Sequence, residues 1–464
     1  MSADRPTNPE TASVVAANAP QKHAWILIAW MLQILIPLRL INDLGEAFPA
    51  INTAAIVLLC MIVGAAIWPR SRLWIDAHRK QLALAWGSMF FTFVLLETSL
   101  SVLFKLRVID YWTTDFALMV YENSDRTLRF DPVRGCFLAT TPSRFTRVVE
   151  GEHEYVGVMR GNAQGFPDRD DFEIQRKTPE QRRIAVFGDS FTAAQYLERS
   201  WPDAVEDRVR PQGTDLELLN FSVDGGGLIN WWSVLTRHLP EAEYDLDGII
   251  FAVYADDLSR RFFIADHERE KAPLIGRIPF GDPSKLPTTF EQARPHLSSS
   301  GIIVATDVFE RILAGANIRT RYWSPYLLTN YDFWVRRQQN EQMLRVVRQS
   351  LKAHPLHKQY VTEIHDFIQQ RQIPVLVVHV PQPEELLAEM VYQEHAALTQ
   401  EFAKNIGAEW LDGCVPYRDL KPEQIRENWF QSDPHWNQQG SDRFAEFVAK
   451  HLLTWPRELF SSRN

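Results

Sequence analysis

Cysteine is scarce in this chain. Its 464 residues contain three, Cys60, Cys136 and Cys414, and their spacing forms no metal-binding motif. Cys136 and Cys414 would pair as a disulfide in an oxidising compartment, but two unpaired thiols fit the sequence at least as well. His365 and His379 stand alone, and we interpret His379 as a core histidine because it lies in an apolar run. The sequence therefore predicts no metal site.

Blocks of basic residues are also lacking. The formal net charge is −9, from 49 Lys and Arg against 58 Asp and Glu, so the chain has no electrostatic footprint for nucleic acid. The glycine turn 225–227 is not followed by the Lys-Ser/Thr of a phosphate-cradling loop. We expect neither a nucleic-acid partner nor a cofactor. The length and the balanced composition predict a folded chain of two or three units.

Long apolar runs are confined to the first hundred residues. They cover about residues 24–40, 47–68 and 82–104, after a polar tail, residues 1–22, that we expect to be disordered. A membrane-spanning helix needs about 20 apolar residues. The second and third runs provide them, and the shorter first run meets this need least well. We predict about three transmembrane helices within residues 23–105.

The orientation of these helices follows from Lys and Arg in short loops. The loop of residues 69–81 contains four such residues: Arg70, Arg72, Arg79 and Lys80. This loop is therefore expected in the cytoplasm, and the chain after residue 104 outside it, in the periplasm or extracellular space. We predict a multi-pass protein of the cytoplasmic (inner) membrane. Glu97 falls near the outer end of the third run, where it can reach the membrane interface.

An alternation of strands and helices begins near residue 183. Short apolar runs predict five strands, at residues 184–187, 216–220, 248–254, 373–380 and 408–411. Helical patterns lie between and after them: about 192–209, a helix ending near 238, a helix ending near 372, 384–405 and 438–453. This alternation favours a parallel sheet covered on both faces. We predict an α/β fold, a three-layer α/β/α domain over residues 183–455.

Two further segments complete the predicted organisation. Residues 106–182 form a lead-in that contains short strands. Residues 260–355 interrupt the α/β alternation over a length far beyond an ordinary loop, so we interpret them as an insertion that acts as a lid or partner surface. The insertion is rich in aromatic side chains: Tyr322, Trp323, Tyr326, Tyr331, Phe333 and Trp334.

The first motif with chemical meaning is Gly188-Asp189-Ser190, at the end of the first predicted strand. The glycine permits a tight turn, and Ser190 then begins a helix, where free N–H groups stabilise a developing oxyanion. The tripeptide alone is weak evidence, because a helix-capping turn has the same appearance.

The second motif is Asp433-Pro434-His435, just before the last predicted helix, which Asn437 would cap. A serine nucleophile needs a base, and the base needs a group that orients it. His435 and Asp433 can supply these roles on one turn.

Two loops follow the next two predicted strands. Residues 220–226 end in Gly225 and Gly226, and a glycine in such a loop exposes its backbone N–H. Residues 253–257 end in Asp256 and Asp257. Taken separately, the two loops also fit an ordinary turn and a solvated acidic turn.

These four blocks, in this order, resemble the SGNH hydrolase superfamily, also called GDSL-like, over residues 183–455 without the insertion. The resemblance implies a flavodoxin-like sheet and a serine esterase or acyltransferase. It implies that Ser190 is the nucleophile, that His435 is the general base and that Asp433 holds His435. The N–H groups of Ser190 and Gly225 would be oxyanion donors.

The chain departs from the family at two positions. Ser432 stands where the family commonly has the aspartate, and Asp433 resembles the Asp-x-His-Trp variant of polysaccharide O-acetylation proteins. Asp256 stands where the family has a third oxyanion donor, an amide. An ionised carboxylate cannot donate a hydrogen bond, and the loss of one donor costs about a hundredfold to a thousandfold in rate. Three alternatives remain: Asp256 is protonated, another group donates, or catalysis is impaired.

The resemblance and the predicted topology together indicate a membrane-anchored esterase or O-acyltransferase. Its substrate would be an acyl ester, in particular an acetyl ester, of an extracytoplasmic glycan, and a membrane O-acyltransferase would be its partner. Asp256 favours a different hypothesis, in which the chain is a catalytically impaired scaffold or binding subunit. The aromatic-rich insertion favours a third, a lipase-like esterase with a lid.

Overall fold

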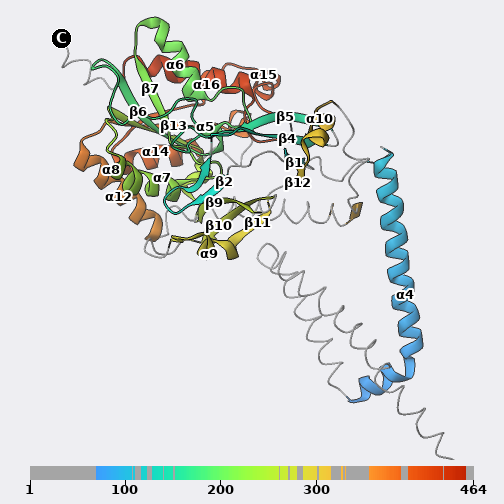
Figure 1. Ribbon diagram of the computed structural model, residues 1–464. Coiled ribbons are helices and arrows are strands. Elements are labelled where there is room, and N and C mark those ends of the chain that lie inside the picture. The colour runs from blue at the N-terminus through green and yellow to red at the C-terminus, as the bar shows by residue number, and fades with distance from the viewer. Residues whose placement is uncertain are drawn as a thin grey trace, which may run out of the picture. The chain divides into compact units, whose positions relative to one another are not determined.

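The structure, a computed structural model, describes residues 69–106, 108–109, 117–122, 128–138, 140–149, 152–260, 262–269, 272–279, 286–299, 302–314, 326–327, 330, 355–387, 395–431 and 433–455. Two compact units contain them (Figure 1). One unit comprises residues 1–113 and 323–345. The other comprises residues 114–322 and 346–464 and contains every predicted site residue.

A five-stranded parallel sheet forms the centre of the second unit, in the order β14-β13-β8-β6-β7. If the five strands are numbered by their order in the chain and read from the β7 edge, the order is 2-1-3-4-5, the flavodoxin-like arrangement. The strands are β6 (Arg182–Phe187), β7 (Leu216–Asn220), β8 (Gly248–Val253), β13 (Val375–His379) and β14 (Glu409–Leu411). The predicted parallel α/β sheet is therefore confirmed, with its strands in the predicted places.

Both faces of this sheet are buried, which explains why its strands are continuous apolar runs. Along β6, Ala185 and Phe187 pack into one core and Ile184 and Val186 into the other. Helices α7 (Leu228–Ser233), α12 (Pro355–Arg371) and α14 (His395–Ile406) contribute to the first core, and α6 (Trp201–Val209) and α16 (Gln438–Leu452) to the second. The parallel sheet and the helices on its two faces thus form three layers in the second unit (Figure 1).

Two predicted helices are interrupted. The segment predicted as one helix over 192–209 forms α5 (Ser190–Ala193) and α6, because Ala194 adopts a left-handed conformation with φ 49° and ends α5. The segment predicted over 384–405 forms α13 (Pro383–Leu386) and α14, with residues 388–394 outside the described part. The remaining short helices are η1 (Arg210–Gln212), η2 (Val234–His238), α8 (Leu239–Ala242), η3 (Ala255–Leu258), η7 (Val415–Tyr417) and α15 (Pro422–Arg426).

The lead-in and the insertion share a second sheet, in the order β12-β1-β4-β5. Its strands are β1 (Ala117–Glu122), β4 (Ser143–Val149), β5 (Glu152–Met159) and β12 (Ile302–Val304). Since β12 comes from the predicted insertion and pairs in parallel with β1, the insertion completes a sheet of the lead-in. The exact domain boundaries stay a prediction.

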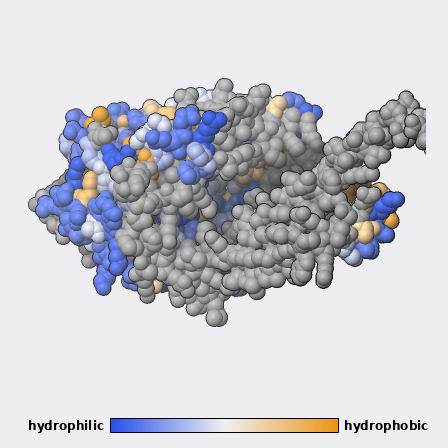
Figure 2. Space-filling model, turned by 90° about the horizontal axis from the view of Figure 1, so that it is seen from below, coloured by the Kyte–Doolittle hydropathy of each residue, from blue (hydrophilic) through white to orange (hydrophobic). Residues whose placement is uncertain are grey.

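Smaller elements surround these sheets. A hairpin forms from β2 (Leu128–Asp131) and β3 (Gly135–Leu138). A three-stranded sheet forms from β9 (Phe262–Arg269), β10 (Ala272–Pro279) and β11 (Leu297–Ser299). The insertion also contains α9 (Phe290–Ala293), η5 (Arg294–His296) and α10 (Thr306–Leu313). The described surface at the left of Figure 2 is mainly hydrophilic, with scattered apolar residues.

The described residues of the other unit include a long helix, α4 (Pro69–Lys105). The stretch Lys80–Phe104, with a mean hydropathy of 1.6, is long and apolar enough to cross a membrane, and 17% of its most apolar part is buried. Residues 69–81, predicted as a loop, continue this helix. The polar tail and the first two apolar runs lie outside the described residues, so the prediction of about three spans stays a prediction.

Glu97 is buried near the end of α4 and does not remain unpaired. Its carboxylate accepts hydrogen bonds from Ser101 Oγ at 3.1 Å and from the backbone N–H of Leu327 at 3.0 Å. Ser101 Oγ in turn accepts from the N–H of Tyr326. The carboxylate therefore has a structural role, and its position at the membrane interface stays a prediction.

Candidate active site

Ser190 lies at the carboxyl edge of the parallel sheet, directly after β6. The strand order reverses between β6 and its two neighbours, and such a switch point is the usual ligand site of an open α/β sheet. Asp189 caps α5 because its side chain accepts a hydrogen bond from the N–H of Phe191 at 3.0 Å. The cap fixes the turn that presents Ser190.

The segment with Asp433 and His435 is held rigidly before α16. Trp429 and Trp436 form an antiparallel bridge, and the N–H of Phe430 donates to the carbonyl of His435 at 3.1 Å. Asn437 caps α16 as predicted, since its side chain accepts from the N–H of Gly440 at 3.2 Å. These contacts fix the direction of the histidine side chain.

A continuous hydrogen-bond chain joins Ser190, His435 and Asp433. Ser190 Oγ and His435 Nε2 are 2.6 Å apart. On the other side of the ring, His435 Nδ1 hydrogen-bonds to Asp433 Oδ1, which also accepts from the His435 backbone N–H at 3.0 Å. With the ring proton on Nδ1, the lone pair of Nε2 faces the serine hydroxyl. This is the arrangement that a histidine base requires.

The second oxygen of Asp433 is held by residues from the lead-in sheet. Arg147 Nη1, from β4, lies 2.9 Å from Asp433 Oδ2, and Tyr155, from β5, donates its hydroxyl to the same atom at 3.1 Å. Neither contact was predictable from the sequence, because Tyr155 and Asp433 are 278 positions apart and neither Arg147 nor Tyr155 belongs to a local motif. The alternation of residues along 143–159 was the only available signal, and it predicts a strand but not its partner.

The charges around the histidine have opposite effects on its pKa and on that of Asp433. Burial raises the pKa of Asp433, but His435 and Arg147 outweigh it, so this pKa lies below its ordinary range. Burial lowers the pKa of His435, and the negative charges of Asp433, Asp189 and Asp224 outweigh it, so this pKa is raised. Asp433 therefore stays ionised, and His435 binds a proton more readily than an ordinary histidine.

Gly225 lies in the loop after β7 with φ 69°, a left-handed conformation that glycine adopts without strain. The loop is tied to the turn before Ser190, because the N–H of Val223 donates to the carbonyl of Gly188 at 3.2 Å. Within the described residues, neither the N–H of Ser190 nor that of Gly225 donates to another backbone carbonyl. Both groups remain open as oxyanion donors.

Asp256 faces an arginine that the sequence did not single out. Its Oδ2 lies 3.1 Å from Arg260 Nε, and its Oδ1 accepts from the Ser259 hydroxyl at 3.2 Å. The carboxylate thus serves as an acceptor and an ion-pair partner. The three alternatives for the missing amide donor stay hypotheses.

Arg260 also pairs with two other buried carboxylates beside the nucleophile. Arg260 Nη1 lies 2.8 Å from Asp257 Oδ1 and 3.5 Å from Asp189 Oδ2, and donates to the carbonyl of Gly226. Burial and the charge of Asp189 raise the pKa of Asp257 well above its ordinary value. One arginine therefore joins the turn before Ser190, the glycine loop and the loop after β8.

Neither family models nor curated proteins match this chain. The solved structures to which it is similar include three that each cover 58–60% of this chain, over 98% of their own length. They are TesA (12% identity, TM-score 0.32), AlinE4, described as an SGNH-hydrolase family esterase (15%, 0.29), and the acetyl xylan esterase AlAXEase (11%, 0.30). Similarities this low do not indicate the chemistry of this chain, which is inferred from the side-chain geometry.

The raised pKa of His435 predicts the pH dependence of any activity that uses it as a base. The neutral imidazole is the active form, so kcat/KM for an ester should fall as the pH drops through a midpoint above the ordinary histidine value of about 6.5. A pH–rate profile of the full chain tests this.

In the same assay Asp433→Asn should lower kcat by about 10⁴-fold, because the ring would lose the carboxylate that selects its tautomer. Asp307→Asn, at an exposed ion pair, should leave the rate unchanged. A midpoint below 6.5, or an Asp433→Asn variant as active as Asp307→Asn, would contradict these assignments.

Proposed function

We propose that this chain is a serine ester hydrolase or acyltransferase of the SGNH type. The observation that carries the proposal is the hydrogen-bond chain from Ser190 Oγ through His435 to Asp433. Its buried end is fixed by Arg147 and Tyr155, so the base has a single orientation. A half-buried serine with a base and an orienting carboxylate is the arrangement used for acyl transfer on unrelated folds.

The reaction proceeds in two steps. Ser190 Oγ attacks the ester carbonyl while its proton passes to His435 Nε2, and the backbone N–H groups of Ser190 and Gly225 stabilise the oxyanion. The intermediate collapses to an acyl-serine, and the leaving alcohol takes the proton from His435. In the second step His435 removes a proton from water, which gives hydrolysis, or from a sugar hydroxyl, which gives transfer. The oxygen of that group attacks the acyl carbonyl, and the bond to Ser190 Oγ breaks as His435 returns the proton to Oγ.

We further propose that the enzyme is anchored in the cytoplasmic membrane and acts on acyl, in particular acetyl, esters of an extracytoplasmic glycan. The apolar stretch Lys80–Phe104 supports the anchor. The Asp433-Pro434-His435-Trp436 sequence supports the substrate through its resemblance to polysaccharide O-acetylation proteins. A membrane O-acyltransferase that supplies acyl groups is the expected partner.

Replacement of the nucleophile tests the activity. With 4-nitrophenyl acetate as substrate, Ser190→Ala should lower kcat of the full chain in detergent by about 10⁴-fold or more. Ser441→Ala is the matched control, since Ser441 is buried in α16 and its Oγ has no hydrogen-bond partner among the described residues. Equal activity of the two variants would refute catalysis by Ser190, and a preference for long-chain esters would favour the lipase-like alternative.

Removal of the negative charge of Asp256 distinguishes a catalytic site that is adapted to this residue from one that is impaired by it. In our account Asp256 holds Arg260, so Asp256→Asn should weaken that ion pair and lower kcat/KM by about tenfold or more, in line with the loss of a charged hydrogen bond of roughly 1.5–3 kcal/mol. A large increase in activity would instead mean that the asparagine amide supplies a missing oxyanion donor, and it would support the scaffold hypothesis. Glu310→Gln, at an exposed end of an ion pair with Arg144, serves as the control for charge alone.

The proposed topology has a separate test. A reporter that is active only in the periplasm should be active when fused after Asp110, because the charged residues 70–80 are expected in the cytoplasm and residues 82–104 are expected to cross the membrane. The same reporter fused after residue 75 should be inactive. The reverse pattern would place the catalytic unit inside the cell.

A further inference from the structure

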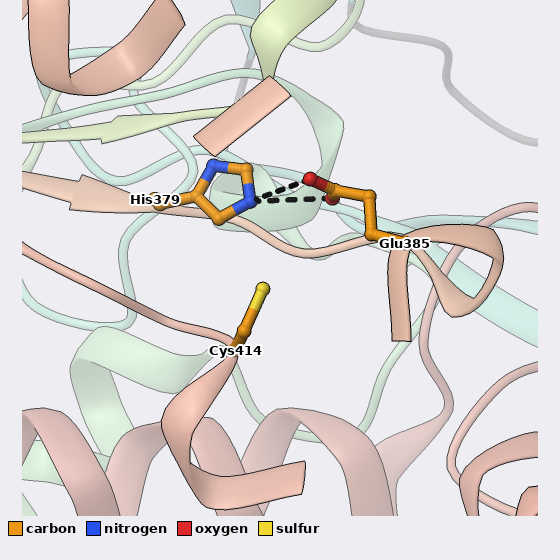
Figure 3. A group of neighbouring side chains, drawn as sticks. All are labelled: His379, Glu385 and Cys414. Atoms are coloured by element: carbon orange, nitrogen blue, oxygen red, sulfur yellow. Dashed lines mark hydrogen bonds and ion pairs between the residues drawn. The ribbon is translucent and has the colours of Figure 1, made fainter. Parts of the chain in front are cut away.

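A second cluster of reactive side chains lies at the same edge of the sheet, two strands away from β6. It consists of His379, Glu385 and Cys414, which come from the end of β13, from α13 and from the turn before η7 (Figure 3). The candidate catalytic chemistry uses none of them. No metal-binding spacing was visible in the sequence, because His379 and Cys414 are 35 positions apart, and the fold brings them together.

The donor atoms of the three side chains converge. His379 Nε2 lies 3.1 Å from Glu385 Oε1 and 3.2 Å from Oε2, and one ligand atom of each residue lies within 4.8 Å of the other two. In Figure 3 the sulfur of Cys414 points toward the space between the imidazole and the carboxylate. Cys414 is a free thiol, so the disulfide with Cys136 considered from the sequence does not form.

The surrounding backbone fixes this geometry. A side chain at Gly413 would bring a Cβ within 1.9 Å of the carbonyl oxygen of His379, so only glycine permits the turn of Cys414 to approach β13 this closely. Glu385 Oε2 accepts from the N–H of Gln382 at 2.9 Å, and the N–H of Cys414 donates to Asp412 Oδ1 at 3.0 Å. Two of the three side chains are thus oriented by their own loops.

His379 does not behave as a satisfied core histidine. Its side chain is completely buried, and within the described residues its Nδ1 has no hydrogen-bond partner. Burial of an unpaired polar atom costs free energy, and a purely structural position would favour an apolar residue. A ligand on Nε2, the nitrogen that faces Glu385, with the ring proton on Nδ1, gives a reason for a histidine there.

We propose that His379, Glu385 and Cys414 bind a divalent transition-metal ion, with Zn²⁺ the best match. Imidazole, carboxylate and thiolate are the ligands that zinc takes in proteins, at about 2.0–2.3 Å. In a tetrahedral site such bonds place the donor atoms about 3.3–3.6 Å apart. The His379–Glu385 separation is already close to this value, and Cys414 needs only a small side-chain movement. The ion ties β13, α13 and the turn after β14 together.

A metal titration of the purified, tag-free full chain tests the proposal. After treatment with a chelator, the chain should bind one equivalent of Co²⁺, with the near-ultraviolet charge-transfer absorption of a thiolate–cobalt bond. Zn²⁺ should displace the cobalt and raise the thermal midpoint of the chain. Cys414→Ser should abolish the absorption. It should also weaken Zn²⁺ binding by more than the roughly 10- to 100-fold loss that is typical when a residue outside the ligand shell is replaced.

Matched variants make the test specific. Cys136→Ser, at the other described cysteine that forms no disulfide, should bind both metals as the parent does. So should Ser190→Ala, which keeps this result independent of the proposed ester chemistry. Cys414→Ser is nearly isosteric, so it remains informative even if His379→Gln misfolds. Absence of a thiolate–cobalt absorption in the parent, or its persistence in Cys414→Ser, would overturn the proposal.

Discussion

Burial of the Asp433 carboxylate is unfavourable unless other groups compensate its charge and its hydrogen bonds. Three side chains do so: His435 on one oxygen, and Arg147 and Tyr155 on the other. The candidate site depends on this contact, because Asp433 orients the ring of His435 and the ring in turn faces Ser190. Since Arg147 and Tyr155 belong to the lead-in sheet, that sheet is a structural part of the site.

The negative charge around Ser190 imposes a second constraint. Asp189, Asp256 and Asp257 surround one arginine, Arg260. Removal of one partner from such a buried array leaves the other charges uncompensated. Asp256, which stands at the position where the resemblance expects an amide, has Arg260 as its ion-pair partner. In the proposed mechanism an oxyanion in this site would depend on the backbone N–H groups of Ser190 and Gly225.

The sequence predicted those features that depend on local patterns. Apolar runs bounded by glycine or charge located all five parallel strands, and the residues after β6 and before α16 located the serine and the histidine. Long-range pairing was not predictable in this way. The contact of Tyr155 with Asp433, the pairing of β12 with β1 and the ion pairs of Arg260 follow from packing, and their residues resemble ordinary surface residues in a sequence. The break at Ala194 was missed because a left-handed alanine has no sequence signal.

The central claim is that Ser190 carries the acyl group during turnover. The most direct measurement is mass spectrometry of the acid-quenched full chain after brief exposure to an acetylated glycan or another acetyl ester. Our account predicts an acetyl group on the peptide that contains Ser190, lost on longer incubation and absent from Ser190→Ala. Consumption of the ester with no acyl group on Ser190, or with the group on another residue, would contradict it.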